Sequence, residues 1–313
     1  MSQHAHDHQV HAPDHDHHQH FNLQNRRAFI FALILNGGFV IVELAFGIFA
    51  HSLALIADAI HNFGDVLGLM LAWAALHFAQ RKATARFTYG FGSATILAAL
   101  VNAILLILVA CGIAWEALHR MQQPIAVNTS VMMAVAGIGI VINAATAWLF
   151  VARQHEDINI KGVYLHMVAD ALVSVGVVLT GIGIAFTAWQ WLDPAISVLI
   201  AVVIIGSTWS LLRDAVRMAL HAAPNNIDVE EVRAYLQSLP GVAQVHDLHV
   251  WPISTTITAL TAHLLIPEGK TSDAFLLNTA ATIKQKFGIG HSTLQIETSS
   301  TTEHMCHSWD ADN

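Results

Sequence analysis

Six successive apolar stretches constrain this chain more than any other feature, because each is about long enough to cross a lipid bilayer as a helix. Inside the roughly 30 Å hydrocarbon layer a backbone must satisfy its own hydrogen bonds, which favours helices. Only 12% of the 313 residues are charged, against about 25% in soluble domains. The sequence therefore predicts a membrane all-α domain with spans near residues 29–49, 53–78, 91–117, 129–152, 162–188 and 192–212.

The placement of basic residues predicts how these spans are oriented. Lys and Arg precede the first span and occupy the loops between spans two and three and between spans four and five: Arg26, Arg27, Arg81, Lys82, Arg86, Arg153 and Lys161. In the loops after spans one, three and five, Arg120 is the only Lys or Arg. Cytosolic loops carry the excess of Lys and Arg, so both termini are expected in the cytosol. The net charge of −8 argues against a nucleic-acid partner, since no basic surface would neutralise phosphates.

After Arg217 the pattern changes to that of a small water-exposed domain. Residues 222–300 contain no apolar run long enough to span a membrane. Hydrophobic periodicity and turn residues predict a helix, two strands, a second helix and a third strand, at 227–239, 242–251, 255–266, 272–287 and 291–298. This α-β-β-α-β order predicts an α+β domain of the metallochaperone or ferredoxin-like kind, with both helices on one face of the sheet.

The remaining segments are expected to be tails. Residues 1–25 are predicted to be a disordered cytosolic tail, and residues 1–20 contain eight histidines with three aspartates among them. This composition suits a weak, multi-site metal collector, and a purification tag is the alternative. The six-span domain is assigned to residues 26–217, and residues 301–313 form a loose polar end.

Two of the predicted spans each carry a histidine and an aspartate four residues apart, His61 with Asp65 and His166 with Asp170. Positions i and i+4 lie on one face of a helix, so each pair points in one direction. Ionisable side chains within a membrane are costly and usually functional. Two imidazoles and two carboxylates match the number and kind of ligands that tetrahedral Zn²⁺ takes, with no net charge. The alternative for each histidine is a hydrogen-bonded packing residue.

The same residues suggest how metal and proton movements could be linked. Imidazole has an ordinary pKa near 6.5, so a histidine that loses its metal can take up a proton. Asp58, one turn before His61, is expected either to orient that histidine or to bridge two helices. Glu43 in the first span is a candidate for a proton path. Asp193 and Pro194 are expected to begin the sixth helix, with Asp193 as its cap.

These features together resemble the cation diffusion facilitator family, specifically its zinc-exporting branch of the bacterial zinc, cadmium and cobalt type. The resemblance covers residues 26–300 and is carried by both His-Asp pairs, by the segment from Ser52 to His61 and by the segment from Val245 to Trp251. It implies a homodimer joined through the cytosolic domain, which exchanges cytosolic metal for protons by alternating access. It also implies an integral protein of the bacterial cytoplasmic membrane.

The resemblance further implies a regulatory zinc site in the small domain, formed by His246, His263 and Glu297 with Gln295 nearby. Surface histidines on a mixed sheet are the alternative. Regular strand alternation predicts that His246 and Leu248 share one face, with Asp247 and His249 on the other.

The sequence thus favours a secondary transporter that exports Zn²⁺, with Cd²⁺ and Co²⁺ as further candidates, in exchange for H⁺. No prosthetic group is expected, and Zn²⁺ serves as substrate and as regulatory ligand. An enzyme with a hydrolytic metal lacks support because no HExxH motif occurs. A metal-sensing receptor lacks an attached signalling module. An ATP-driven pump is disfavoured because no GxxxxGK[ST] motif occurs.

Overall fold

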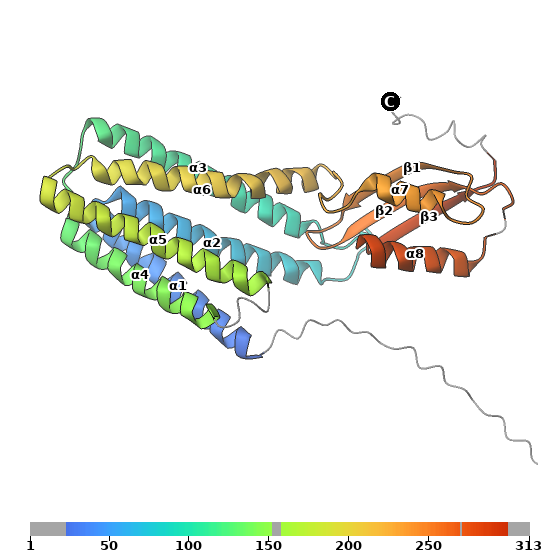
Figure 1. The fold of residues 1–313 in the computed structure, drawn as a ribbon, viewed down its shortest axis with the longest axis horizontal. Helices are drawn as coiled ribbons and strands as arrows, with labels where there is room; N and C mark the ends of the chain where they lie inside the picture. Colours follow the sequence, from blue (N-terminus) through green and yellow to red (C-terminus); the bar gives the residue numbers. More distant parts are fainter. Residues whose placement is uncertain (1–22, 152–157, 270, 300–313) are drawn as a thin grey trace, which may run out of the picture.

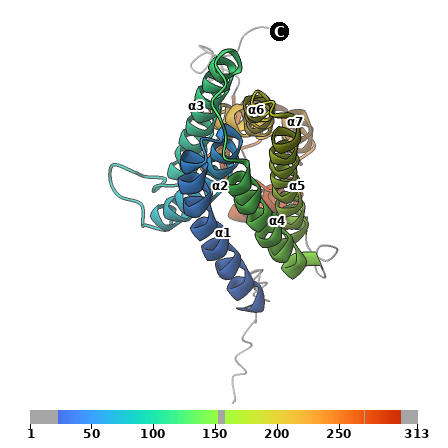
Figure 2. The ribbon, with the colours of Figure 1, turned by 90° about the vertical axis from the view of Figure 1, so that its left-hand side faces the viewer.

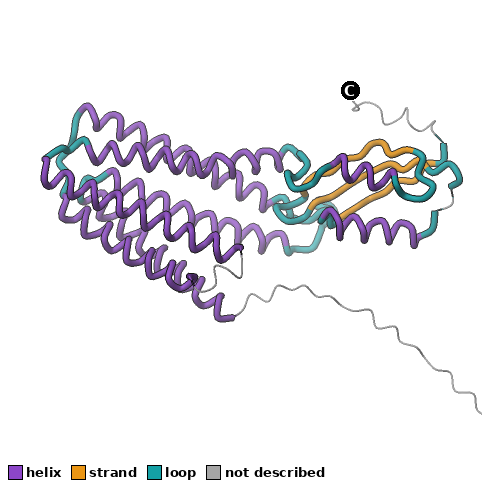
Figure 3. The backbone as a smooth tube through the Cα atoms, in the orientation of Figure 1, coloured by secondary structure: helices purple, strands orange, loops and turns teal. Residues whose placement is uncertain are grey.

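A computed structural model of the chain describes residues 23–151, 158–269 and 271–299. A bundle of six long helices and a small α+β unit lie end to end (Figures 1 and 3). The bundle consists of α1 (Leu23–Phe49), α2 (Leu53–Ala79), α3 (Ala94–Gln122), α4 (Thr129–Val151), α5 (Ile158–Thr187) and α6 (Leu192–Ala219). A helix lies at each of the six predicted spans, and α6 continues seven residues past its predicted end. The expectations for residues 1–22 and 301–313 fall outside the described residues, and the predicted domain limits stay predictions.

The surface of the bundle is apolar, as a membrane domain requires. The large side chains of Trp115, Trp148 and Phe186 are 77 to 87% exposed, which water would penalise and lipid does not. Among the described residues five helices are long and apolar enough to span a membrane, and the described apolar part of α1, Ile34–Phe49, is shorter. Buried carboxylates such as Asp58 lie inside the bundle instead.

Helix α2 occupies the middle of the bundle, with contacts to α1, α3, α5 and α6. Around it α3 packs along α6, and α4 packs along α5 (Figure 2). At the end far from the α+β unit, a core of small and branched side chains such as Ala54, Leu55 and Ile204 fills the space between helices. This packing leaves α2 and α5 as the neighbours that can combine the two His-Asp pairs.

The start of α6 differs from the prediction. The residue before its first helical turn is Trp191, and no side chain caps that turn. Asp193 lies inside α6 and is 1% exposed. Its carboxylate instead accepts hydrogen bonds at the beginning of α2, from the Ser52 hydroxyl at 2.6 Å and from the backbone N–H groups of Leu53 at 2.8 Å and Ala54 at 3.3 Å. The predicted cap is therefore wrong: Asp193 belongs to α6, but its carboxylate caps the beginning of α2.

The α+β unit contains α7 (Val229–Gln237), β1 (Gln244–Pro252), β2 (Thr258–Leu265), α8 (Asp273–Phe287) and β3 (His291–Glu297). The sheet order is β1-β2-β3, with β1 antiparallel and β3 parallel to β2. Side chains of both helices and of one sheet face share a single core, which includes Val232, Leu236, Leu260, Leu264 and Ile283. The fold class and the placement of both helices on one face are as predicted.

Strand β1 is irregular at the point where the sequence predicts strict alternation. His246 pairs with His263 and His249 pairs with Thr261, so an extra residue bulges between them. Asp247 adopts a left-handed backbone with φ of 49° at this bulge. Leu248 lies in the core, while His246 faces the other side of the sheet. The prediction that His246 and Leu248 share a face is therefore wrong, because a bulge shifts the alternation by one residue.

The two parts of the molecule meet at the turn between β1 and β2. The Ser93 hydroxyl before α3 donates to the carbonyl of Ile253 at 3.2 Å, and the N–H of Thr255 donates to the Thr95 hydroxyl at 3.0 Å. The ring of Tyr89 lies edge-on to His291 with centroids 5.7 Å apart. The β1–β2 turn thus lies against the beginning of α3.

Candidate metal sites

Helices α2 and α5 bring all four residues of the two His-Asp pairs together, and we call this group the bundle site. Nε2 of His61 lies 3.9 Å from Oδ2 of Asp65 and 3.5 Å from Oδ1 of Asp170. Nε2 of His166 lies 3.2 Å from Oδ2 of Asp65 and 3.6 Å from Oδ2 of Asp170. The two imidazole rings are T-shaped, with centroids 6.1 Å apart. Nitrogen and oxygen ligands therefore alternate round a small ring.

These separations suit a small divalent cation. A tetrahedral Zn²⁺ with bonds of 2.0–2.1 Å has ligand-to-ligand distances of about 3.3 Å. Oδ2 of Asp65 and Oδ1 of Asp170 are buried and make no hydrogen bond of acceptable geometry among the described residues, although imidazole nitrogens lie 3.2 and 3.5 Å away. Such orphaned oxygens are costly unless a cation or another donor satisfies them. A divalent ion would also balance the charge of the two carboxylates.

A cavity of about 570 Å³ leads from the bundle site to the β1–β2 turn, and we call it the vestibule. Asp65, His166 and Asp170 line it at one end, and Thr255 and Thr256 line it at the other. In the opposite direction from the bundle site, α2 is packed tightly: Ala54, Leu55 and Ala57 have no exposed surface. The open space beside the bundle site therefore extends toward the end that carries the α+β unit.

Glu43 and Asp58 form a second buried group beside the bundle site. The Asn62 amide donates to Oε2 of Glu43 at 3.4 Å and to Oδ1 of Asp58 at 3.5 Å. The Ser174 hydroxyl of α5 donates to Oδ2 of Asp58 at 3.0 Å. Asp58 thus bridges α2 and α5, which was one of its two expected roles. Sequence reasoning missed Asn62, although its spacing of four from Asp58 was a usable signal, and missed Ser174, for which no signal existed.

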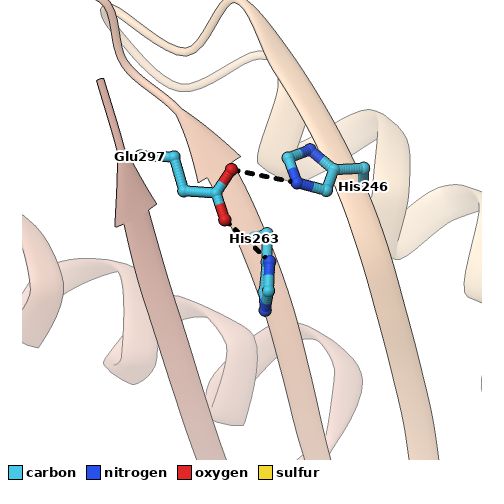
Figure 4. Close-up of side chains that lie close together, drawn as sticks. All are labelled: His246, His263 and Glu297. Atoms are coloured by element: carbon cyan, nitrogen blue, oxygen red, sulfur yellow. Dashed lines mark ion pairs between the residues drawn. The ribbon is translucent and has the colours of Figure 1, made fainter. Parts of the chain in front are cut away.

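The outer face of the sheet carries the other predicted group, His246, His263 and Glu297, which we call the sheet site (Figure 4). Its three residues come from adjacent strands, and one ligand atom from each lies within 4.8 Å of the others. Nε2 of His246 is 3.1 Å from Oε2 of Glu297, and Nδ1 of His263 is 2.9 Å from Oε1. The predicted trio is therefore brought together, on the face away from α7 and α8.

The nitrogens of the sheet site also support a cation. Nε2 of His246 and Nδ1 of His263 are buried and close to Glu297, yet neither has a hydrogen-bond partner among the described residues. Gln295 donates its amide to Oε1 of Glu297 at 2.9 Å, which holds that carboxylate in place. Two lone-pair nitrogens and a carboxylate facing one another fit a zinc ion with one further ligand position.

Comparison with known proteins identifies two family models that together match most of the chain. Residues 29–219 match the family model described as the cation efflux transmembrane domain, and residues 224–299 match the cation efflux protein cytoplasmic domain.

Similar relatives cover most of the chain. A cadmium, cobalt and zinc/H⁺-K⁺ antiporter of Bacillus velezensis is 34% identical over 90% of this chain and 91% of its own length. The metal cation efflux system protein CzcD of Cupriavidus metallidurans is 37% identical over 87% of each chain. The zinc transporter ZitB of Escherichia coli is 34% identical over 90% of this chain and 91% of its own. All three are named for transport, as expected here, and none as an enzyme.

Proposed function

The chain belongs to the cation efflux family, and from that premise we propose that it exports Zn²⁺ from the cytosol in exchange for protons. The bundle site carries this proposal, because it combines two imidazoles and two carboxylates at separations of 3.2 to 3.9 Å within a membrane domain. Cd²⁺ and Co²⁺ are further candidate substrates, since a relative's name includes them. Ligand type alone does not set the preference, because nitrogen and oxygen sites generally bind copper more tightly than zinc.

The vestibule supports a route from the cytosol to the bundle site. It opens beside the α+β unit, on the side where the basic loops predict the cytosol. In this state a metal ion would reach Asp65, His166 and Asp170 through the vestibule, while packed residues such as Leu55 close the other side. Export then requires an alternate state in which the closed side opens. The proposed location is the bacterial cytoplasmic membrane, with both termini in the cytosol.

Exchange for protons follows from the chemistry of the two histidines. An imidazole nitrogen binds metal only when it is unprotonated, so metal release leaves His61 and His166 able to accept protons from the other side. The adjacent Glu43 and Asp58, both fully buried, are proposed to lie on the proton path. Potassium is the competing counter-ion, because one relative is named for H⁺ and K⁺ together.

The sheet site is proposed to bind regulatory Zn²⁺ in the cytosol, and the α+β unit is proposed to join two copies of the chain. The unpartnered nitrogens of His246 and His263 support the first part. The match of residues 224–299 to the cytoplasmic domain of cation efflux proteins supports the second.

Uptake into inside-out vesicles under an imposed pH gradient tests the proposal. Zn²⁺ uptake is expected to be driven by a proton gradient and to persist when potassium is replaced by sodium. Asp65→Ala and Asp170→Ala should each reduce uptake to that of vesicles without the transporter. His77→Ala is the matched control, since His77 lies on α2 outside the bundle site and stacks on Trp73. Full uptake by either aspartate variant would refute the assignment.

The pH dependence of binding tests the coupling separately. The Zn²⁺ concentration that half-saturates uptake should rise as the cytosolic-side pH is lowered from about 8 to about 5.5, because protons compete for imidazole nitrogens. Half-saturation that stays constant over this range would exclude histidine protonation as the coupling step.

A further inference from the structure

We propose that Asp247 is the positioning residue of the sheet site: its carboxylate holds His263 in the tautomer whose Nδ1 is free to bind the cation. This inference rests on the proposed regulatory zinc site. It adds a residue that regular strand alternation would place on the other face of the sheet.

The geometry around His263 carries the inference, because the ring lies between two carboxylates. Its Nδ1 is 2.9 Å from Oε1 of Glu297, and its Nε2 is 3.3 Å from Oδ2 of Asp247. A neutral imidazole has one protonated nitrogen and one lone pair. With the proton on Nε2, facing Asp247, the lone pair of Nδ1 faces Glu297 and His246. Carboxylates commonly fix metal-binding histidines in this way.

Asp247 acts through His263 and does not join the ligand set. Its carboxylate lies at the opposite edge of the imidazole ring from Glu297, so one cation cannot contact both carboxylates and Nδ1. The other oxygen of Asp247 is occupied: Nε2 of His249 lies 2.9 Å from Oδ1. His249 is 55% exposed, whereas His263 is 12% exposed. Asp247 therefore links a surface histidine to the less exposed ligand His263.

The bulge in β1 explains how Asp247 reaches this position. Val245 and Leu248 both lie in the core, so the two residues between them, His246 and Asp247, face outward together. The left-handed backbone at Asp247, φ 49°, makes this possible. Bulges re-aim side chains near functional sites, and a non-glycine residue in this conformation carries a conformational cost that neighbouring structure must offset.

Two substitutions separate the carboxylate from the backbone. Asp247→Asn and Asp247→Gly both tolerate a left-handed backbone, but only Asn keeps an oxygen that can accept the proton on Nε2. The measurement is Zn²⁺ binding to the full chain in detergent, with a competing chelator, in the Asp65→Ala/Asp170→Ala background. The His246→Ala/His263→Ala variant of that background serves as the blank, so the difference reports the sheet site alone.

Affinity is expected to fall in the order wild type, Asn, Gly, with Gly about 10- to 100-fold weaker than wild type. The melting temperatures of the two variants should match. At saturation the Co²⁺ absorption bands should be the same for all three proteins, because the ligands are unchanged.

Two results would overturn the inference: Gly binding as tightly as wild type, or a changed Co²⁺ spectrum in Gly, which would make Asp247 a ligand. Failure of the proposed regulatory site gives a different result: the His246→Ala/His263→Ala blank would then bind as much Zn²⁺ as the Asp65→Ala/Asp170→Ala protein from which it is made.

Discussion

Each histidine of the bundle site lies between two carboxylates rather than beside one. His61 contacts Asp65 of its own helix at 3.9 Å and Asp170 of α5 at 3.5 Å, and His166 mirrors this at 3.6 and 3.2 Å. Loss of one aspartate therefore disturbs both imidazoles. This is why single aspartate variants are expected to lose transport fully rather than by half.

A substitution of one ligand of the bundle site is expected to change the selectivity between metal ions. His61→Asp would give three carboxylates and a net charge of about −1 with a divalent ion bound, which favours larger or harder cations such as Cd²⁺ and Mn²⁺. The ratio of Zn²⁺ to Cd²⁺ uptake in vesicles should fall by about tenfold, equivalent to about 1.4 kcal/mol.

His61→Asn is the matched control, since it supplies a neutral oxygen without the extra charge. If both variants keep the wild-type ratio, imidazole at position 61 does not set selectivity.

At this scale the sequence predicted the residues that repeat a spacing and missed those that meet only through the fold. The i,i+4 spacing was sufficient to identify His61 with Asp65 and His166 with Asp170 as candidates. Ser174 reaches Asp58 from another helix, and Asp247 reaches His263 through a bulge. Neither contact has a local pattern in the sequence.

Among the helices, α2 depends on α6 for the order of its first turn. Asp193 accepts hydrogen bonds from Ser52, Leu53 and Ala54 there, so one buried carboxylate satisfies donors that the helix itself cannot. The Ser52 hydroxyl also accepts from the N–H of Leu55. Because α2 carries His61 and Asp65, these hydrogen bonds to Asp193 fix the position of both side chains along the axis of the bundle.

Asp193→Ala should therefore destabilise the bundle more than Ser52→Ala. The aspartate variant leaves a buried hydroxyl and two N–H groups without an acceptor, at about 1–3 kcal/mol per unsatisfied group. The serine variant loses a cap worth about 0.5–2 kcal/mol.

Thermal unfolding in detergent measures both variants. Asp214→Ala, which removes a partly exposed aspartate of the same helix, should melt like wild type. Equal melting of Asp193→Ala and wild type would show that the hydrogen bonds to Asp193 are not needed.

Helix limits were predictable because hydrophobic length and turn residues are local, whereas the partner of a helix end is not. An Asp-Pro pair at the start of a span predicts a cap for that span. Here the beginning of α2 packs against Asp193, whose carboxylate accepts from the N–H groups of Leu53 and Ala54 rather than from those of its own helix. The bulge in β1 was missed for the same reason: the pairing with β2 decides it.

Across the whole molecule, the vestibule is bounded by both the bundle and the α+β unit. Thr255 and Thr256 of the β1–β2 turn line it, and the hydrogen bond from Thr255 to Thr95 holds that turn against α3. The same two strands carry His246 and His263. One hairpin therefore extends from the sheet site to the vestibule.

Cysteine labelling tests on which side this route opens. In a chain whose Cys111 and Cys306 are replaced by alanine, Ala99→Cys places a thiol in the vestibule wall. A charged, membrane-impermeant thiol reagent should label it in inside-out vesicles and not in right-side-out vesicles.

Ala57→Cys is the matched control, because Ala57 is fully buried on the closed side of the bundle site and should react in neither. Labelling of Ala99→Cys from the right-side-out preparation alone would reverse the proposed direction of access.

Because the bundle and the α+β unit both line the vestibule, the two parts cannot be exchanged between relatives independently of each other. In a chimera that takes its α+β unit from a relative, the donor would bring its own residues at the positions of Thr255 and Thr256, which line the vestibule and so the proposed metal route. The uptake kinetics of the chimera would then differ from those of the recipient, even though every membrane helix is the recipient's own. A graft that preserves native permeation has to retain the recipient's hairpin turn together with the residues before α3 that receive it.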